Sequence, residues 1–364
     1  MFDALFALTL VATASAVPQA GTLAIHADKA LLADGRTVDD AWIVVEGTKI
    51  RSIDSGGEAP TDASRYEHHG WVSAGLIALH AYAGGTGELR DPTRTVLPEA
   101  RAAWAFDPAH PEFADCVRQG ITSVVLTPAP QSLVGGVSAV VKSAGGTVVA
   151  REAQLTFGFS ARSLAPNRFP TSFAGGLAEL ERLLEKPSGA LKQAKDGELP
   201  VLFEVSARPD VLRAIAFAHD HDLKGALSGA DWTGELAQAV KESGMSVVLP
   251  PIAVGEDLRT LRAIRALGDA GVPFGFGLDV PQSHPANLRI AAALCVRAGL
   301  KTEQAWRALG ADAARIAGVE KRIGALEKGL DADLVLWSGD PLDLASSVAA
   351  VFVDGKLVYS AEAR

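Results

Sequence analysis

The chain has 364 residues, of which 48% are hydrophobic and 21% are charged, so it is long enough to bury a large core. Its formal net charge of -9 argues against a nucleic-acid partner, which would favour a basic face. No long apolar span follows the amino terminus, so we do not expect an integral membrane protein. These properties indicate a soluble α/β protein with one large domain and one smaller domain.

The first residues predict an export signal. The apolar segment 4–11 is followed by Ala14-Ser15-Ala16, which fits the small-x-small cleavage pattern. The mature chain would then begin near Val17, and the protein would be periplasmic or secreted. Met1-Phe2-Asp3 carries no positive charge, so a buried strand in this segment is the alternative reading.

Strand-like alternation of apolar and polar residues occurs near both ends of the chain. Residues 22–53 contain three such runs, and residues 333–337 and 350–353 add two more. Asp354-Gly355 is a typical hairpin turn after the last of these. We therefore expect a small β-sandwich domain that is assembled from residues 17–73 and 319–364.

The middle of the chain, residues 74–318, alternates short apolar runs with amphipathic helical patterns. This alternation predicts a parallel sheet with helices outside it, and the length is close to the ~250 residues of a (β/α)8 barrel. A doubly wound open sheet is the alternative, but no Gly-x-Gly-x-x-Gly follows a strand. The runs are 121–126, 200–203, 245–249 and 272–276, and the helical patterns are 210–222, 233–243 and 257–270.

Four phrases of this sequence resemble motifs of the amidohydrolase superfamily, in its imidazolonepropionase-like branch. They are 72–80 (VSAGLIALH), 120–124 (GITSV), 277–279 (GLD) and 324–335 (GALEKGLDADLV). The last phrase is long and specific, and the resemblance covers nearly the whole mature chain. It implies a TIM-like barrel together with the two-ended β-domain.

The resemblance also implies a reaction, namely hydrolysis of a non-peptide C–N or related bond in a small substrate. In this family one or two divalent metal ions activate a water molecule, and an Asp after the eighth strand handles the proton. The site is built from His-x-His on the first strand, often a Lys or Glu on the fourth, a His on each of the fifth and sixth, and that Asp.

This sequence departs from the family pattern at the ligand positions. His80 matches the first histidine and Asp279 matches the final aspartate, but Tyr82 stands at the second histidine position. Glu204 stands where the fifth-strand histidine is expected, and Ser228 or a neighbour takes the sixth-strand position. Residues 156–160 contain no lysine.

The residues that remain could form one unusual metal site. His80, Glu204 and Asp279 would bind one divalent ion, with Asp279 also acting as general base and Tyr82 as an electrophilic helper. This oxygen-rich set would suit Mn²⁺ or Fe²⁺ better than Zn²⁺. Tyr82 is a poor ligand near pH 7, because a phenol has a pKa of about 10. His284 is the only spare histidine placed to face the pocket.

A metal-free interpretation is equally open. His80 could be hydrogen-bonded in the barrel interior, and Arg208 or Lys142 could pair with Glu204, since an unpaired buried carboxylate is costly. The chain would then be a pseudo-enzyme that binds a small molecule, forms a homo-oligomer or pairs with an active relative. No Gly-x-Ser-x-Gly indicates a serine nucleophile. Cys116 and Cys295 lie in apolar helical contexts and predict buried free thiols, with a disulfide as the alternative.

Overall fold

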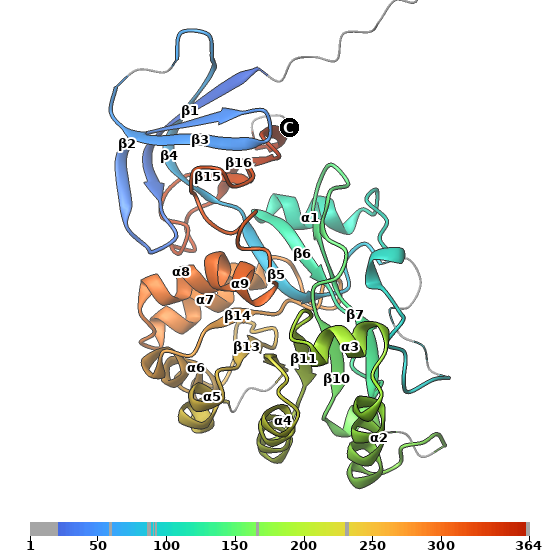
Figure 1. Ribbon diagram of the computed structural model, residues 1–364. Coiled ribbons are helices and arrows are strands. Elements are labelled where there is room, and N and C mark those ends of the chain that lie inside the picture. The colour runs from blue at the N-terminus through green and yellow to red at the C-terminus, as the bar shows by residue number, and fades with distance from the viewer. Residues whose placement is uncertain are drawn as a thin grey trace, which may run out of the picture.

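The computed structural model describes residues 21–57, 60–85, 89, 91, 93–164, 167–229 and 233–361. The expected export signal, residues 1–16, lies outside these ranges, so the location of the protein stays a prediction. The described chain forms a β-sheet region that sits on one end of a barrel (Figure 1). In these ranges no helix has the length and apolar character that crossing a membrane requires.

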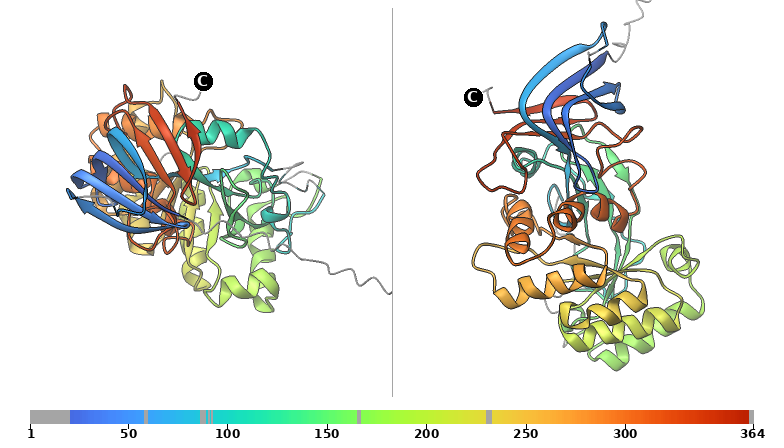
Figure 2. Two further views of the ribbon diagram at one scale, coloured as in Figure 1. Left: turned by 90° about the horizontal axis from the view of Figure 1, so that it is seen from above. Right: turned by 90° about the vertical axis from the view of Figure 1, so that its left-hand side faces the viewer.

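The sheet region combines strands from both ends of the chain, as the two views in Figure 2 show. The two sets of strands meet where β4 pairs antiparallel with β15. Side chains from both sets, including Ile25, Ile43, Leu334 and Phe352, share one buried core, so the sheet curls around its own apolar interior. Its order is β17-β16-β15-β4-β1-β2-β3, with β1 Thr22–Leu31, β2 Thr37–Glu46, β3 Lys49–Ser55, β4 Ser64–Ala74, β15 Leu334–Trp337, β16 Val348–Val353 and β17 Lys356–Ser360.

The barrel is built from two hydrogen-bonded sheets. Their strands are almost entirely buried, which is why they are continuous apolar runs rather than alternating ones. One sheet has the order β14-β13-β12-β11-β10-β7, and the other has the order β5-β6-β8-β9. The strands are β5 Leu76–Ala81, β6 Ile121–Leu126, β7 Val134–Val137, β8 Ala139–Lys142, β9 Val148–Ala150, β10 Leu155–Gly158, β11 Val201–Glu204, β12 Gly225–Ser228, β13 Ser246–Leu249 and β14 Phe274–Phe276.

The third strand of the barrel differs from the predicted all-parallel arrangement. The segment containing β7 and β8 runs antiparallel to β6 on one side and to β10 on the other. No helix separates it from β6 or from β10, although this part of the chain is described throughout. The mixed α/β fold is confirmed, but the regular (β/α)8 repeat holds only for the remaining strands.

The barrel closes where β5 meets the segment after β14. Leu79 and Gly277 form a parallel bridge, and the Leu278 N–H donates to the Leu79 carbonyl at 3.1 Å. A Cβ atom on Gly277 would lie 2.7 Å from the Leu249 carbonyl oxygen, closer than real Cβ atoms approach. Glycine at this position therefore allows the strands to come together.

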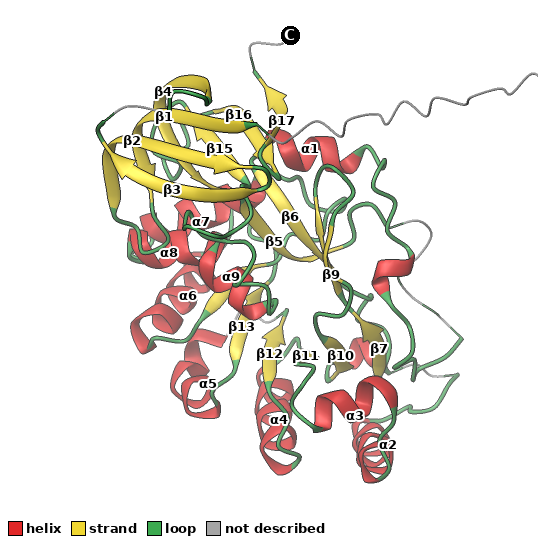
Figure 3. Ribbon diagram, turned by 45° about the horizontal axis from the view of Figure 1, so that its top comes forward, coloured by secondary structure: helices red, strands yellow, loops and turns green. Residues whose placement is uncertain are grey.

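Helices cover the outside of the barrel strands (Figure 3). They are α1 Glu112–Arg118, α2 Phe173–Glu185, α3 Gly189–Lys195, α4 Arg208–Asp220, α5 Ala237–Ser243, α6 Leu258–Ala270, α7 Asn287–Arg297, α8 Thr302–Leu309 and α9 Ala311–Ile316, with 3-10 turns at Ala102–Trp104, Ala161–Ser163 and Thr233–Leu236. Cys116 on α1 and Cys295 on α7 are buried free thiols, as predicted.

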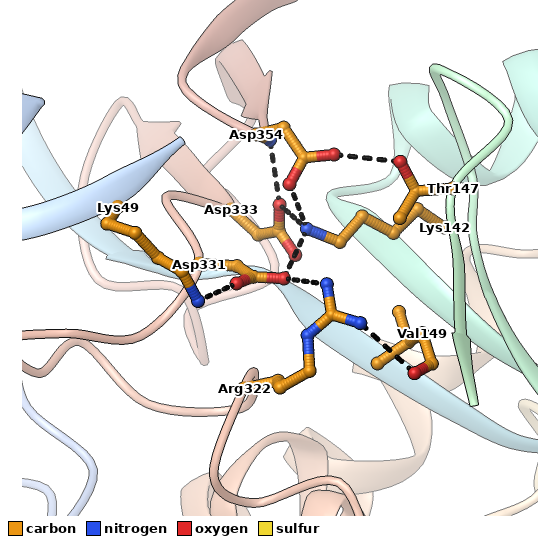
Figure 4. Close-up of polar contacts among 8 residues, drawn as sticks. All are labelled: Lys49, Lys142, Thr147, Val149, Arg322, Asp331, Asp333 and Asp354. Carbon is orange, nitrogen blue, oxygen red and sulfur yellow. Dashed lines mark hydrogen bonds and ion pairs between the residues drawn. The ribbon is translucent and has the colours of Figure 1, made fainter. Parts of the chain in front are cut away.

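A buried ion cluster joins the barrel to the curled sheet (Figure 4). Lys142, at the end of β8, is completely buried and its Nζ lies 2.8 Å from Asp331 Oδ2 and 3.1 Å from Asp333 Oδ1. The same ammonium group also contacts Asp354. Asp331 and Asp333 precede β15 and Asp354 follows β16, so the cluster connects elements that are far apart in sequence. Asp331 and Asp333 therefore have a structural role in this cluster.

Candidate active site

His80 is held at the mouth of the barrel by an irregular end of β5. The pairing of β5 with β6 shifts register between Ala78 and Ala81, and His80 itself has φ of +54°. Asp279 has φ of +52°, and its N–H donates to the His80 carbonyl at 2.9 Å. Left-handed backbone at two facing non-glycine residues is uncommon and is concentrated at functional sites. The backbone thus aims both side chains at each other.

The imidazole of His80 lies between two carboxylates. Its Nδ1 is 2.6 Å from Asp279 Oδ1, and its Nε2 is 3.0 Å from Glu204 Oε1. His80 and Glu204 are only 8% and 4% exposed, whereas the Asp279 side chain is 33% exposed. Both ring nitrogens face carboxylate oxygens, which an imidazolium can satisfy by donating from each nitrogen.

Electrostatics favour that charged form. Burial on its own would lower the pKa of His80, but the negative charge of Glu204 and the hydrogen bonds to Asp279 and Glu204 outweigh it and raise the pKa to about 10. The buried carboxylate of Glu204 is in turn compensated by this cation. Each charge therefore lowers the energetic cost of burying the other.

Tyr82 packs against the same histidine. Its ring meets the His80 ring edge to face, with 5.4 Å between centroids. Burial, together with the charges of Asp279 and Glu204, raises the pKa of the Tyr82 phenol above its usual value. The phenol is therefore neutral near pH 7 and available as a hydrogen-bond donor.

A pocket of about 500 Å³ opens beside these residues. Its size is in the range of small-molecule sites. Tyr82 and Asp279 form part of its wall, and the other lining residues lie in segments that follow barrel strands. Those residues are Gly85, Leu89, Glu112, Ala129, Pro130, Gln131, Arg162, Pro281 and Gln282.

The structure brings together His80, Glu204 and Asp279 as expected from their strand-end positions, with Tyr82 beside them. The partner of Glu204 is His80, so the prediction that Lys142 could pair with it is wrong, because Lys142 lies in the aspartate cluster. No contact between Arg208 and Glu204 occurs among the described residues.

Ser228 lies at the strand end where it was predicted, whereas His284 does not face the pocket. Ser228 ends β12 and is buried, in register with Glu204 on β11. His284 is exposed and its Nδ1 accepts a hydrogen bond from the Ala286 N–H at 3.1 Å, just before α7. His284 therefore holds a turn and is not part of the pocket wall described above.

The polar pocket residues that were not found from the sequence include Glu112, Gln131 and Arg162. They lie in segments after β5, β6 and β10, and such loops line the site in barrel enzymes. The position of these residues after predicted strands could have indicated that they line the pocket. It does not select these three from the other polar residues of the same loops.

The three predicted metal ligands do not fit a single ion in this arrangement. The carboxylates of Glu204 and Asp279 lie at opposite edges of the His80 ring, so an ion at Nε2 beside Glu204 would be out of reach of Asp279. A catalytic zinc site needs about three protein ligands around one point. Within the described ranges no three His, Cys, Asp or Glu side chains are arranged to hold a metal ion. The ligand roles stay predictions.

Comparisons with known proteins agree with the fold. A sequence profile of the Amidohydrolase family matches residues 235–358. Amidohydrolase tasK of Hapsidospora irregularis is 22% identical over 390 residues, covering 86% of this chain and 40% of that protein. Imidazolonepropionase of Thermoplasma volcanium is 30% identical over 133 residues, covering 34% of this chain and 33% of that protein. The chain thus matches less than half the length of either relative.

A solved structure extends the likeness to the whole fold. An amidohydrolase from Thermotoga maritima superposes with a TM-score of 0.82 at 22% identity, covering 93% of this chain and 100% of that one. Superfamily members of this kind typically depend on a metal. The profile match and the two relatives show that the chain is similar to proteins of the amidohydrolase superfamily, an imidazolonepropionase among them.

Proposed function

We propose that the protein is a metal-free member of the superfamily that binds a small polar molecule in the pocket beside Tyr82 and Asp279. The observation that carries this proposal is that each ring nitrogen of His80 lies within hydrogen-bonding distance of a carboxylate oxygen, an arrangement that suits a ring protonated at both nitrogens. A histidine binds a metal through an unprotonated ring nitrogen, and an imidazolium has none. Pairing with an active relative, a second role for such a protein, stays a prediction.

The substitutions support the same proposal from another side. Tyr82, Glu204 and Ser228 occupy positions where the family resemblance implies histidines. Each change removes a nitrogen ligand, and Glu204 adds a negative charge that the His80 cation compensates. A proton on His80 therefore supplies a positive charge between the two carboxylates.

Hydrolysis of a non-peptide C–N bond is the second candidate function. The proteins that resemble this chain include an amidohydrolase and an imidazolonepropionase. Asp279 also combines a place in the pocket wall with a partly exposed side chain, as a general base requires. The metal content of the protein separates the two functions.

Elemental analysis tests the proposal. The protein is prepared without chelator, incubated with Zn²⁺, Mn²⁺ or Fe²⁺ at micromolar concentration, and freed of unbound metal. We expect a content far below one ion per chain. The matched control is His80→Ala, because metal that this variant retains is bound elsewhere on the surface. A content near one ion per chain that falls in His80→Ala would overturn the proposal and favour the hydrolase.

A further inference from the structure

The pocket contains a cation that has no partner among the described residues. Arg162 follows β10 on the turn Ala161–Ser163 and lines the pocket, and no described residue forms an ion pair or hydrogen bond with its guanidinium group. Its positive charge acts on the phenol of Tyr82, which lines the same pocket. A planar guanidinium beside a phenol donor is a typical recognition site for a carboxylate.

Two carboxylates in the same pocket have unused acceptor oxygens. Asp279 uses Oδ1 to accept from His80, and no described donor reaches its Oδ2. Glu112 uses Oε2, which accepts from the Gly84 N–H at 3.1 Å and lies 3.3 Å from His110 Nδ1. No described donor reaches its Oε1. These two oxygens could accept from a ligand ammonium or amide N–H group.

An amide group in the pocket wall adds a further polar group. Gln131 is partly buried, and its Oε1 is shielded from solvent and has no hydrogen-bond partner among the described residues. Leaving a shielded acceptor unpaired is costly. Rotation of the side chain toward the pocket would let a donor group on a bound molecule satisfy it.

Resting on the function proposed above, we propose that the pocket binds a small dipolar molecule whose carboxylate pairs with Arg162 and whose ammonium group pairs with Asp279 and Glu112. Leu89, Pro130 and Pro281 supply apolar wall for a short side chain of that molecule. The pocket volume of about 500 Å³ admits a molecule the size of an amino acid or a dipeptide.

Calorimetric titration with three matched probes tests this inference. Glycyl-L-leucine carries both charges, N-acetylglycyl-L-leucine lacks the ammonium, and glycyl-L-leucinamide lacks the carboxylate. We expect glycyl-L-leucine to bind, and each of the other probes to bind about tenfold or more weakly, as loss of one charge-assisted hydrogen bond predicts.

Variants assign each charge to its partner. Arg162→Gln should abolish the preference for glycyl-L-leucine over its amide while keeping the preference over the acetylated probe. Glu112→Gln should reduce the preference for glycyl-L-leucine over the acetylated probe and leave the preference over the amide unchanged. Arg151→Gln is the matched control, since Arg151 is exposed and lies outside the pocket wall, and it should bind all probes as the wild type does.

The outcomes separate this inference from the function on which it rests. Equal binding of the three probes, or no binding of any, overturns the dipolar ligand while a low metal content leaves the proposed function intact. Binding of glycyl-L-leucine by a chain that holds one metal ion at His80 supports the dipolar ligand and overturns the metal-free function. Thermal unfolding of each variant confirms that the compared proteins are folded.

Discussion

His80 is the residue on which the proposed metal-free function depends. A metal ligand must offer a lone pair, whereas an imidazole between two carboxylates offers two N–H donors. In the proposed function, the contacts with Glu204 and Asp279 hold His80 as a cation and not as an electron-pair donor. The cation is also the group that makes the buried Glu204 tolerable.

The pH dependence of stability follows from this arrangement. The pKa of His80 is raised in the folded chain to about 10 from an ordinary value of 6.5. Its contribution to the free energy of unfolding is therefore complete below pH 6.5 and is lost as the pH rises through 10. We expect the stability of the wild type relative to His80→Gln to fall across this pH window.

Chemical denaturation of both proteins at several pH values between 6 and 10 measures the difference in their free energies of unfolding. The titration of other groups is common to the two proteins, so it cancels in this difference. NMR of the imidazole provides the direct control, because the His80 ring should stay protonated at pH 8. Removing one partner by Glu204→Gln should lower the pKa of His80. Parallel pH profiles for the wild type and His80→Gln would contradict this account.

The convergence of His80, Glu204 and Asp279 could be predicted, because side chains at the carboxyl ends of barrel strands share one face. What the sequence could not supply is which atoms face each other. The left-handed backbone at His80 and Asp279 decides that the carboxylates take opposite edges of one ring, and nothing in the residue types indicates it. The position of a loop residue such as Arg162 depends on the shape of its loop. The periodicity of apolar residues in the sequence does not indicate that shape.

At the level of elements, strand positions followed from apolar runs but strand direction did not. The run 121–126 matches β6, and the helical pattern 257–270 matches α6, Leu258–Ala270, within one residue. The antiparallel course of β7 and β8 was missed because a buried apolar strand has the same composition in either direction. Direction is set by the short connections at both ends, without a crossover helix.

Barrel closure is the element-level feature most open to test. In Gly277→Ala the new methyl group would lie 2.7 Å from the Leu249 carbonyl oxygen and 3.3 Å from that of Leu79, so β5 or β13 must shift. We expect a loss of about 1–3 kcal/mol in the free energy of unfolding, typical of overpacking in a tight core. Urea denaturation measures it.

Gly135→Ala is the matched control for this substitution. Gly135 lies on β7, and its Cβ would be 3.5 Å from Thr156 Cβ, an ordinary contact. Neither glycine has a positive φ that would penalise alanine. The control should therefore change stability by about 1 kcal/mol or less. Similar losses in both variants would show that the closure is not tightly packed.

At the scale of the whole molecule, the barrel and the curled sheet are joined by charges that neither part could bury alone. Lys142 comes from the barrel, and Asp331, Asp333 and Asp354 come from the carboxyl-terminal strands of the sheet. Burial would lower the pKa of Lys142, but the surrounding carboxylates, led by Asp333, raise it. The ammonium group is therefore charged and the two parts are coupled.

Two lysines that contact the same carboxylate allow the coupling to be measured. Lys142 is fully buried, whereas the Lys49 side chain, which also pairs with Asp331, is 45% exposed. Removing the buried cation leaves carboxylates uncompensated, so Lys142→Met should cost about 3–5 kcal/mol of unfolding free energy. Lys49→Met should cost about 1 kcal/mol or less, as for a solvent-screened pair.

Denaturation of both variants gives these losses, and limited proteolysis shows whether the sheet separates from the barrel first. If the cluster couples the two parts, Lys142→Met should expose cleavage sites at their junction before the barrel unfolds, while Lys49→Met should not. Equal losses for the two lysines would mean that burial of Lys142 adds nothing to the pairing. The joint between the two parts would then depend on the β4–β15 pairing instead.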